Sequence, residues 1–162
     1  MKHFFTATII LLFSFCCEVK ATHIVGGEMT YVCQGEDPQN AANQIYTFTM
    51  NVYRDCFGGQ VGFDSAADTD QFASITVYSG STDFEYVTSK FLAPPQEDFV
   101  NPLNSPCIVS PPNVCVEQGV YVFDLSLPIS DESYYIVYQR CCRNGTISNI
   151  SLPEIAGSTF FI

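Results

Sequence analysis

The chain contains no tryptophan, only two histidines, and only six lysines and arginines against 17 aspartates and glutamates. Its formal net charge is −11 at pH 7. Nucleic-acid binding depends on clustered basic side chains that neutralise phosphates, and anionic membrane surfaces attract basic residues for the same reason. So acidic a chain is repelled by both. The composition therefore excludes a nucleic-acid binder and disfavours an anionic membrane as a partner.

Long apolar runs are also lacking, except at the start of the chain. Residues 1–21 have a basic beginning, an apolar stretch too short to span a bilayer, and small or permissive residues before Ala21, which is typical of a secretory signal peptide. We expect cleavage after Ala21, a mature domain over 22–162, and no membrane insertion of the mature chain. A lipid-modified Cys16 is the alternative, but Phe15 is a poor residue to precede such a thiol.

Few residues are suited to nucleophilic catalysis. Outside the signal peptide the one histidine is His23, which lies two residues from the new N-terminus. An imidazole that activates a nucleophile must be held between two partners, and a terminal residue is rarely held in this way. The many carboxylates leave a glycosidase-like acid pair open, although a domain of this size has little room for a substrate cleft. We expect the protein not to be an enzyme.

Six cysteines remain outside the signal peptide, an even number in an exported chain. This count predicts three disulfide bonds that reinforce a hydrophobic core. Zinc is the competing interpretation, but it prefers short Cys-x-x-Cys steps or histidine partners, and the chain has neither. The predicted disulfide cysteines are Cys33, Cys56, Cys107, Cys115, Cys141 and Cys142.

The spacing of these cysteines limits their pairing. Cys107 and Cys115 lie eight residues apart at the end of a proline-rich segment, and we expect them to form a local bridge. The adjacent cysteines at 141–142 point to opposite faces of a strand, so each needs its own partner. Cys33 and Cys56 are the remaining candidates, and the sequence leaves open which pairs with which. A strained bond between the adjacent cysteines is the alternative.

Alternation of apolar and polar residues predicts β-strands along the mature chain. In 44–54 every second residue from Tyr46 to Val52 is apolar, and 120–127 repeats the pattern. Turn residues separate such stretches, and no sustained helical period follows the signal peptide. The pattern predicts an all-β, immunoglobulin-like β-sandwich of about seven strands, reinforced by disulfides. The expected strands are 24–33, 44–54, 73–78, 84–91, 120–127, 134–140 and 158–162.

Two features interrupt these strands. Gly26 and Gly27 lie inside the first one and predict a bulge or a close approach of another part of the chain. The segments 58–69 and 93–113 are expected to be loops, and the second contains six prolines.

An acidic loop is the best candidate for a metal site. Asp64, Asp68 and Asp70 supply three carboxylates, the hard oxygen ligands that calcium prefers. Their spacing does not match the EF-hand pattern, and acidic loops on acidic proteins are commonly only solvated. Calcium is therefore an alternative, and no other cofactor is expected. Asn144 and Asn149 each begin an Asn-x-Ser/Thr sequon.

Three of the basic residues, Arg54, Arg140 and Arg143, lie within two positions of a cysteine. In so acidic a chain we expect them to pair with carboxylates such as Asp55 and Glu28 and to fix the strand ends around the disulfides. A site for an anionic ligand is the alternative.

Tyrosines are abundant on the expected strands. Most should be core residues or cross-strand pairs, while any that face outward would offer a sugar-binding platform. They are Tyr31, Tyr46, Tyr53, Tyr78, Tyr86, Tyr121, Tyr134, Tyr135 and Tyr138.

Four motifs, in this order, resemble the N-terminal region of large secreted surface proteins of Bacteroidetes: THIVGGE at 22–28, VYRDC at 52–56, PPNVCVE at 111–117 and VYQRCCRN at 137–144. Those proteins usually end in a gliding-motility-associated C-terminal domain, the type B sorting signal of the type IX secretion system. The resemblance covers almost all of 22–162. It implies export across both membranes, display at the cell surface or release, and further immunoglobulin-like or PKD-like repeats downstream.

The chain differs from this family in stopping at Ile162 without a sorting domain, so we expect either a piece of a longer protein or a different export route. Ser65, in Asp64-Ser65-Ala66, resembles the O-glycosylation site of that phylum. The resemblance implies a non-catalytic module, the first of a longer chain, in an exported cell-surface adhesin or gliding-motility-associated protein. Its partners would be surface glycans or other surface proteins. A calcium-dependent or carbohydrate-binding secreted domain is the alternative.

Overall fold

The computed structural model describes residues 24–56, 62–64, 73–80, 82–100, 115–140, 143, 147–153 and 156–162. The predicted signal peptide lies outside these residues. The described part of the chain contains eight strands and no helix of the length and apolarity needed to cross a membrane. The strands are β1 (Ile24–Asp37), β2 (Asn40–Asp55), β3 (Ser74–Ser79), β4 (Glu85–Phe91), β5 (Gln96–Phe99), β6 (Val116–Pro128), β7 (Tyr134–Arg140) and β8 (Ser158–Phe161).

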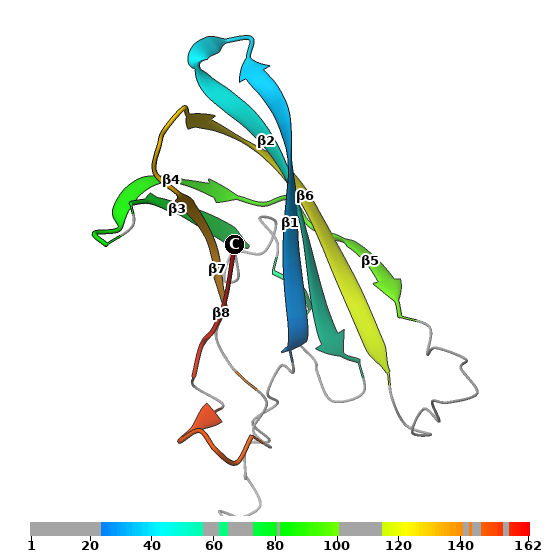
Figure 1. The fold of residues 1–162 in the computed structure, drawn as a ribbon. Coiled ribbons are helices and arrows are strands. Elements are labelled where there is room, and N and C mark those ends of the chain that lie inside the picture. Colours follow the sequence, from blue (N-terminus) through cyan, green and yellow to red (C-terminus); the bar gives the residue numbers. More distant parts are fainter. Residues whose placement is uncertain are drawn as a thin grey trace, which may run out of the picture.

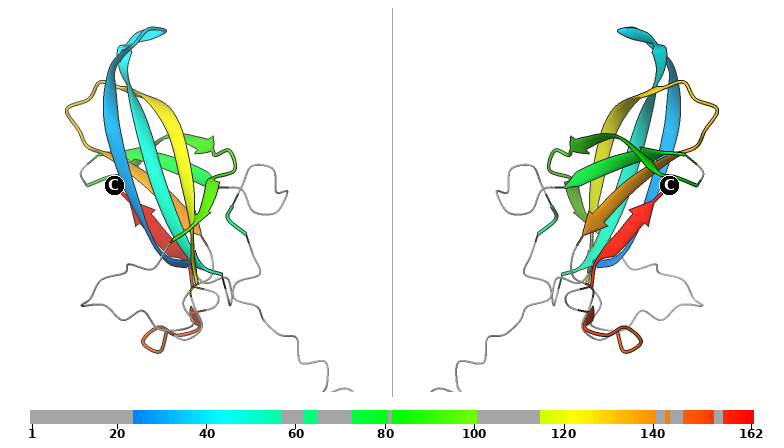
Figure 2. Two further views of the ribbon diagram at one scale, coloured as in Figure 1. Left: turned by 90° about the vertical axis from the view of Figure 1, so that its right-hand side faces the viewer. Right: turned by 90° about the vertical axis from the view of Figure 1, so that its left-hand side faces the viewer.

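The strands form two four-stranded antiparallel sheets, in the orders β1-β2-β6-β5 and β4-β3-β7-β8 (Figure 1). The right-hand view of Figure 2 looks onto the second sheet, with the first sheet behind it. An all-β fold was predicted from the alternating pattern, and it is confirmed.

The core lies between the sheets and is built from the apolar side of each alternating strand. Phe48, Met50 and Val52 of β2 are almost fully buried, and they face Ile75 and Val77 of β3. The inward-facing residues of β6 and β7 complete the core, which confirms the faces predicted for 44–54 and 120–127. Removing these side chains from water is the main favourable contribution to folding.

The strand prediction missed one strand and set three others too short. β5 lies at Gln96–Phe99, inside the segment that was expected to be a loop, which raises the number of strands from seven to eight. All four β5 residues are exposed, so no alternation marks the strand, and its ladder to β6 holds it in place. β1 also continues to Asp37, beyond the predicted end at 33, and β2 and β6 each begin four residues before their predicted starts at 44 and 120. In Figure 1 the joined ends of β1 and β2 project beyond the other strands.

The glycine pair in β1 behaves as predicted. The register of β1 against β2 shifts between Ile24 and Gly26, which marks a bulge or irregularity at this end of the ladder. A Cβ on Gly27 would lie 3.0 Å from the carbonyl oxygen of Asn51 and 3.1 Å from the ring of Phe160. The missing side chain therefore lets β8 approach β1, where the two sheets meet.

A disulfide joins Cys56 to Cys115, with 5.3 Å between their Cα atoms. The predicted local bridge from Cys107 to Cys115 is therefore wrong, as is a bond from Cys56 to the cysteines at 141–142. Asp55 of β2 lies opposite Val116 of β6, so the next residue on each strand is a cysteine and the pair is adjacent across the ladder. The sequence prediction lacked this pairing of β2 with β6. Cys107, Cys141 and Cys142 lie outside the described residues.

Cys33 is an exposed free thiol, so its predicted disulfide is also wrong. Cys33 lies opposite Tyr46, whereas Ile24 at the other end of β1 lies opposite Arg54. Cys33 ends the expected strand 24–33, and Cys56 follows the end of the expected strand 44–54. Neighbouring antiparallel strands run in opposite directions, so those ends lie at opposite ends of the sheet.

Candidate ligand cavity and buried Asp64 cluster

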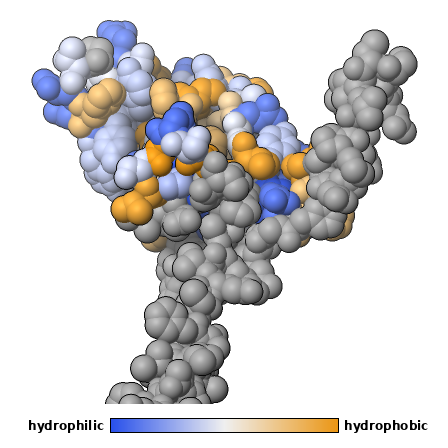
Figure 3. Space-filling model, turned by 90° about the horizontal axis from the view of Figure 1, so that it is seen from below, coloured by the Kyte–Doolittle hydropathy of each residue, from blue (hydrophilic) through white to orange (hydrophobic). Residues whose placement is uncertain are grey.

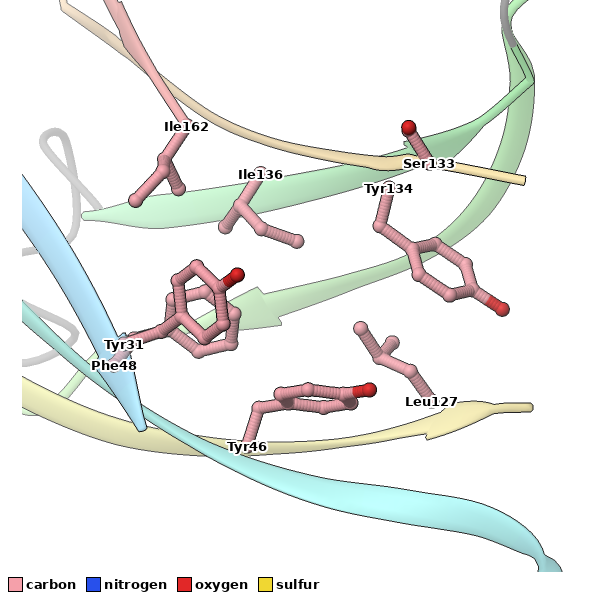
Figure 4. A pocket seen from close by; sticks show the side chains of 8 residues that line it. All are labelled: Tyr31, Tyr46, Phe48, Leu127, Ser133, Tyr134, Ile136 and Ile162. Atoms are coloured by element: carbon pink, nitrogen blue, oxygen red, sulfur yellow. The ribbon is translucent and has the colours of Figure 1, made fainter. Parts of the chain in front are cut away.

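A cavity of about 300 Å³ lies between the two sheets. In Figure 4 its side chains converge from β1, β2, β6 and β7 on one space. The lining is apolar and aromatic, with the hydroxyls of three tyrosines and one serine. The lining residues are Tyr31, Tyr46, Phe48, Leu127, Ser133, Tyr134, Ile136 and Ile162.

The rings on one wall of the cavity pack against each other. The centroid of Tyr31 lies 6.1 Å from that of Tyr46 and 5.7 Å from that of Phe48. Phe48 in turn stacks on Phe123 at 5.4 Å, which fixes this wall to the core. Such ring pairs stabilise beyond the area that they bury. Tyr31 remains 55% exposed, so this wall also reaches the surface.

Two of the three tyrosine hydroxyls already have partners inside the protein. Tyr46 donates a 2.8 Å hydrogen bond to Oε1 of Gln44, and Tyr134 donates a 2.7 Å bond to the carbonyl oxygen of Pro128. Burial raises the pKa of both phenols, so both hydroxyls stay protonated at neutral pH. The cavity therefore offers mainly ring and methyl surface, which suits an apolar or amphipathic group.

A second feature is a buried polar cluster around Asp64. Tyr138 donates a 2.7 Å hydrogen bond to Oδ2 of Asp64, and Tyr121 donates one of the same length to its carbonyl oxygen. Nη2 of Arg140 lies 3.4 Å from Oδ1 of Asp64 and donates a 2.8 Å bond to the carbonyl oxygen of Gly62. The cluster thus joins residues 62–64 to β6 and β7, at the end of the core that carries the disulfide.

Burial is the main cause of the pKa shifts of the two tyrosines in this cluster. It raises the pKa of Tyr121 and Tyr138 far above the ordinary phenol value, and the negative charge of Asp64 adds to both shifts. Arg140 acts in the opposite direction on each phenol. Both phenols therefore serve as hydrogen-bond donors at neutral pH.

The predicted calcium ligands are accounted for only in part. Asp64 is 6% exposed and is held by Tyr138 and Arg140, so its carboxylate faces the protein interior rather than an open loop. Asp68 and Asp70 lie outside the described residues, as do the predicted glycosylation site Ser65 and Asn144 of the first sequon. Within the described ranges no group of three or more His, Cys, Asp or Glu residues is placed to hold a metal ion. The calcium site stays a prediction.

Arg54 and Arg140 pair with carboxylates, as expected, but their partners are Glu117 and Asp64 and not the residues that the sequence suggested. Nε of Arg54 donates a 2.6 Å hydrogen bond to Oε2 of Glu117, and its guanidinium lies 5.1 Å from the ring centre of Phe63. The carboxylate next to Arg140 is Asp64, while Glu28 accepts hydrogen bonds from Asn51 and Tyr53. Arg143 donates to the carbonyl oxygen of Gly157.

The sequence named the tyrosines but not the cavity that three of them line. Tyr31 and Tyr46 lie on the neighbouring strands β1 and β2, whereas Tyr134 begins β7, far along the chain and in the other sheet. Of the three, the sequence pattern assigned an inward position only to Tyr46, through the alternation in 44–54. Their meeting depends on how the sheets stack, which a pattern within one strand does not contain.

Apolar and hydrophilic side chains alternate over the described surface when the molecule is seen from below (Figure 3). Comparison of the chain with models of protein families, with curated proteins and with solved structures gave no match.

Proposed function

We propose that the protein is a non-catalytic module of an exported cell-surface adhesin or gliding-motility-associated protein. The observation that carries this proposal is that the arginines with ion pairs among the described residues pair with carboxylates inside the protein, which leaves these charges unavailable for catalysis. Arg54 is paired with Glu117, and Arg140 with Asp64, so these strongly interacting charges hold strand ends together. The open cavity has an aromatic lining instead, which is suited to contact and not to acid–base chemistry. The four surface-protein motifs support the same role.

We further propose that the fold is an immunoglobulin-like sandwich. The order β1-β2-β6-β5 corresponds to strands A-B-E-D of that fold, and β8-β7-β3 corresponds to G-F-C with β4 as an added edge strand. The Cys56–Cys115 bond joins two neighbouring strands of one sheet, unlike the bond between sheets in antibody domains. Such a bond fits an oxidising compartment outside the cytoplasm.

Protease treatment of intact cells tests the proposed location. An epitope-tagged copy of the full-length gene, expressed in a Bacteroidetes host, should be digested by proteinase K added outside the cells. A periplasmic marker protein in the same cells should survive. Digestion only after lysis would contradict surface display.

A carbohydrate-binding domain is the second candidate function, and the tyrosine-rich cavity is the observation that favours it. The calcium-dependent version has less support, because Asp64 already binds Tyr138 and Arg140. Calorimetric titration with calcium separates the two versions, since a carbohydrate site built from rings and hydroxyls requires no metal.

A further inference from the structure

We propose that the outer face of the β4-β3-β7-β8 sheet binds a neutral polysaccharide. This inference rests on the proposed role at the cell surface and adds a surface and a class of ligand to it. The face lies away from the core and from the cavity, and the right-hand view of Figure 2 looks onto it.

Aromatic side chains form a row across this face. The ladder places Tyr78 of β3 opposite Tyr86 of β4 on one side and opposite Tyr135 of β7 on the other. The rings of Tyr78 and Tyr86 meet edge to face at 6.5 Å, and Phe84 meets Tyr135 in the same way at 4.8 Å. Tyr86 is 63% exposed and Phe84 is 59% exposed. The inward residues Ile75 and Val77 are fully buried, which fixes Tyr78 as outward.

A second row adds apolar surface beside neutral polar groups. Phe161 of β8 lies opposite Val137 of β7, which lies opposite Thr76 of β3, and Thr76 lies opposite Ser89 of β4. Phe161 is 68% exposed. Tyr86 donates a hydrogen bond to Oγ of Ser89, so the hydroxyls of both rows are oriented on the same side of the sheet.

No charged residue occupies an outward position on these four strands in the described part of the chain. The outward residues are Ser74, Thr76, Tyr78, Tyr86, Ser89, Phe91, Tyr135, Val137, Gln139, Thr159 and Phe161. Asp83 lies in the β3–β4 turn, and Glu85 begins β4 opposite Ser79, on the other side of the strand from Tyr86. Lys90 reaches the other way, since its Nζ donates to the carbonyl oxygen of Asp124 on the first sheet.

The outer face of the first sheet shows that this neutrality is local. There Glu28 accepts hydrogen bonds from Asn51 and Tyr53, and Asp124 accepts one from Thr47. In a chain with a net charge of −11, a sheet face without charge selects against ionic partners of either sign. Exposed rings stack on the CH faces of sugars, and Ser, Thr, Gln and Tyr side chains exchange hydrogen bonds with sugar hydroxyls. A neutral polysaccharide matches both properties.

Native gel electrophoresis through gels containing polysaccharide tests this proposal on the purified protein. The probes are a soluble mixed-linkage β-glucan, glucomannan and dextran, with polygalacturonate as the anionic control. We expect retardation by at least one neutral polymer and none by polygalacturonate. Tyr86→Ala and Phe161→Ala should each weaken the apparent affinity at least about fivefold. Tyr86→Phe should stay within about twofold, because it keeps the ring.

Val122→Ala is the matched control, since Val122 is 65% exposed on the outer face of the other sheet. It should bind like the wild type. Mobility unchanged by all three neutral polymers would overturn the proposal. So would a dimer in sedimentation velocity that Phe161→Ala dissociates, because the face would then bind a second copy of the chain. Either result leaves the protease test of surface display intact, so the two proposals fail separately.

Discussion

At the scale of single residues, Asp64 has the most consequential set of contacts. One side chain accepts from the Tyr138 hydroxyl and balances the charge of Arg140, while its backbone carbonyl accepts from Tyr121. Asp64 and Arg140 are both more than nine-tenths buried. Nη1 of Arg140 is buried and has no hydrogen-bond partner among the described residues, so the charge of this guanidinium is compensated mainly by Asp64, which lies next to Nη2.

Replacing Asp64 with asparagine should therefore be strongly destabilising. The change removes the carboxylate that pairs with Arg140 among the described residues and leaves a buried cation, which typically costs about 3–5 kcal/mol of unfolding free energy. Urea unfolding measures the loss. Asp131→Asn, at an exposed loop position, is the control and should change stability by less than about 0.5 kcal/mol. A loss below about 1 kcal/mol for Asp64→Asn would show that the pair contributes little.

At the scale of elements, the short segment 62–64 is held by close packing. Phe63 is 7% exposed and lies on Gly119 of β6, where a Cβ would come within 2.8 Å of the ring. The guanidinium of Arg54 lies over the same ring. A glycine in the middle of a strand thus admits an aromatic side chain from another segment.

Gly119→Ala should destabilise the protein by about 1–3 kcal/mol, because Phe63 must move out of a packed site. Gly26→Ala is the matched control, since a Cβ there would meet nothing within 4 Å. It should leave the midpoint of urea unfolding nearly unchanged. Equal midpoints for both variants would contradict the packing described for Phe63.

Sequence alone predicted most elements, for a reason visible in β2 and β6. One side of each is buried and the other is solvated, so period-two alternation marks them directly. β5 was missed because all its residues are exposed and only its backbone ladder defines it. The disulfide was mispredicted because cysteine spacing along the chain says nothing about which strands are neighbours. The candidate site was predicted only as residue types, since its cavity forms where the two sheets meet.

At the scale of the whole molecule, burial of two phenols links stability to alkaline pH. Burial raises the pKa of Tyr121 and Tyr138 above the ordinary value of about 10. The folded state therefore keeps protons that the unfolded chain loses above that pH. Their contribution to stability is complete below about pH 10 and declines as the pH rises further.

The free energy of unfolding should accordingly fall as the pH rises above about 10 in urea titrations. Tyr138→Phe removes one of the two groups, so its stability should fall less steeply with pH even though it starts lower. Identical slopes for the variant and the wild type would contradict the role of Tyr138.

The bond between Cys56 and Cys115 spans 59 positions of the chain, more than a third of its length. When such a domain is pulled from its two ends, the part inside the bond cannot straighten. The fully extended chain is therefore shorter by about 200 Å, because each of the residues between the two cysteines would otherwise add about 3.3–3.6 Å to its length. The bond therefore limits how far a domain unfolded by force can extend. When the force is released, β2 and β6 are still joined near Cys56 and Cys115, so refolding begins with these strands close together.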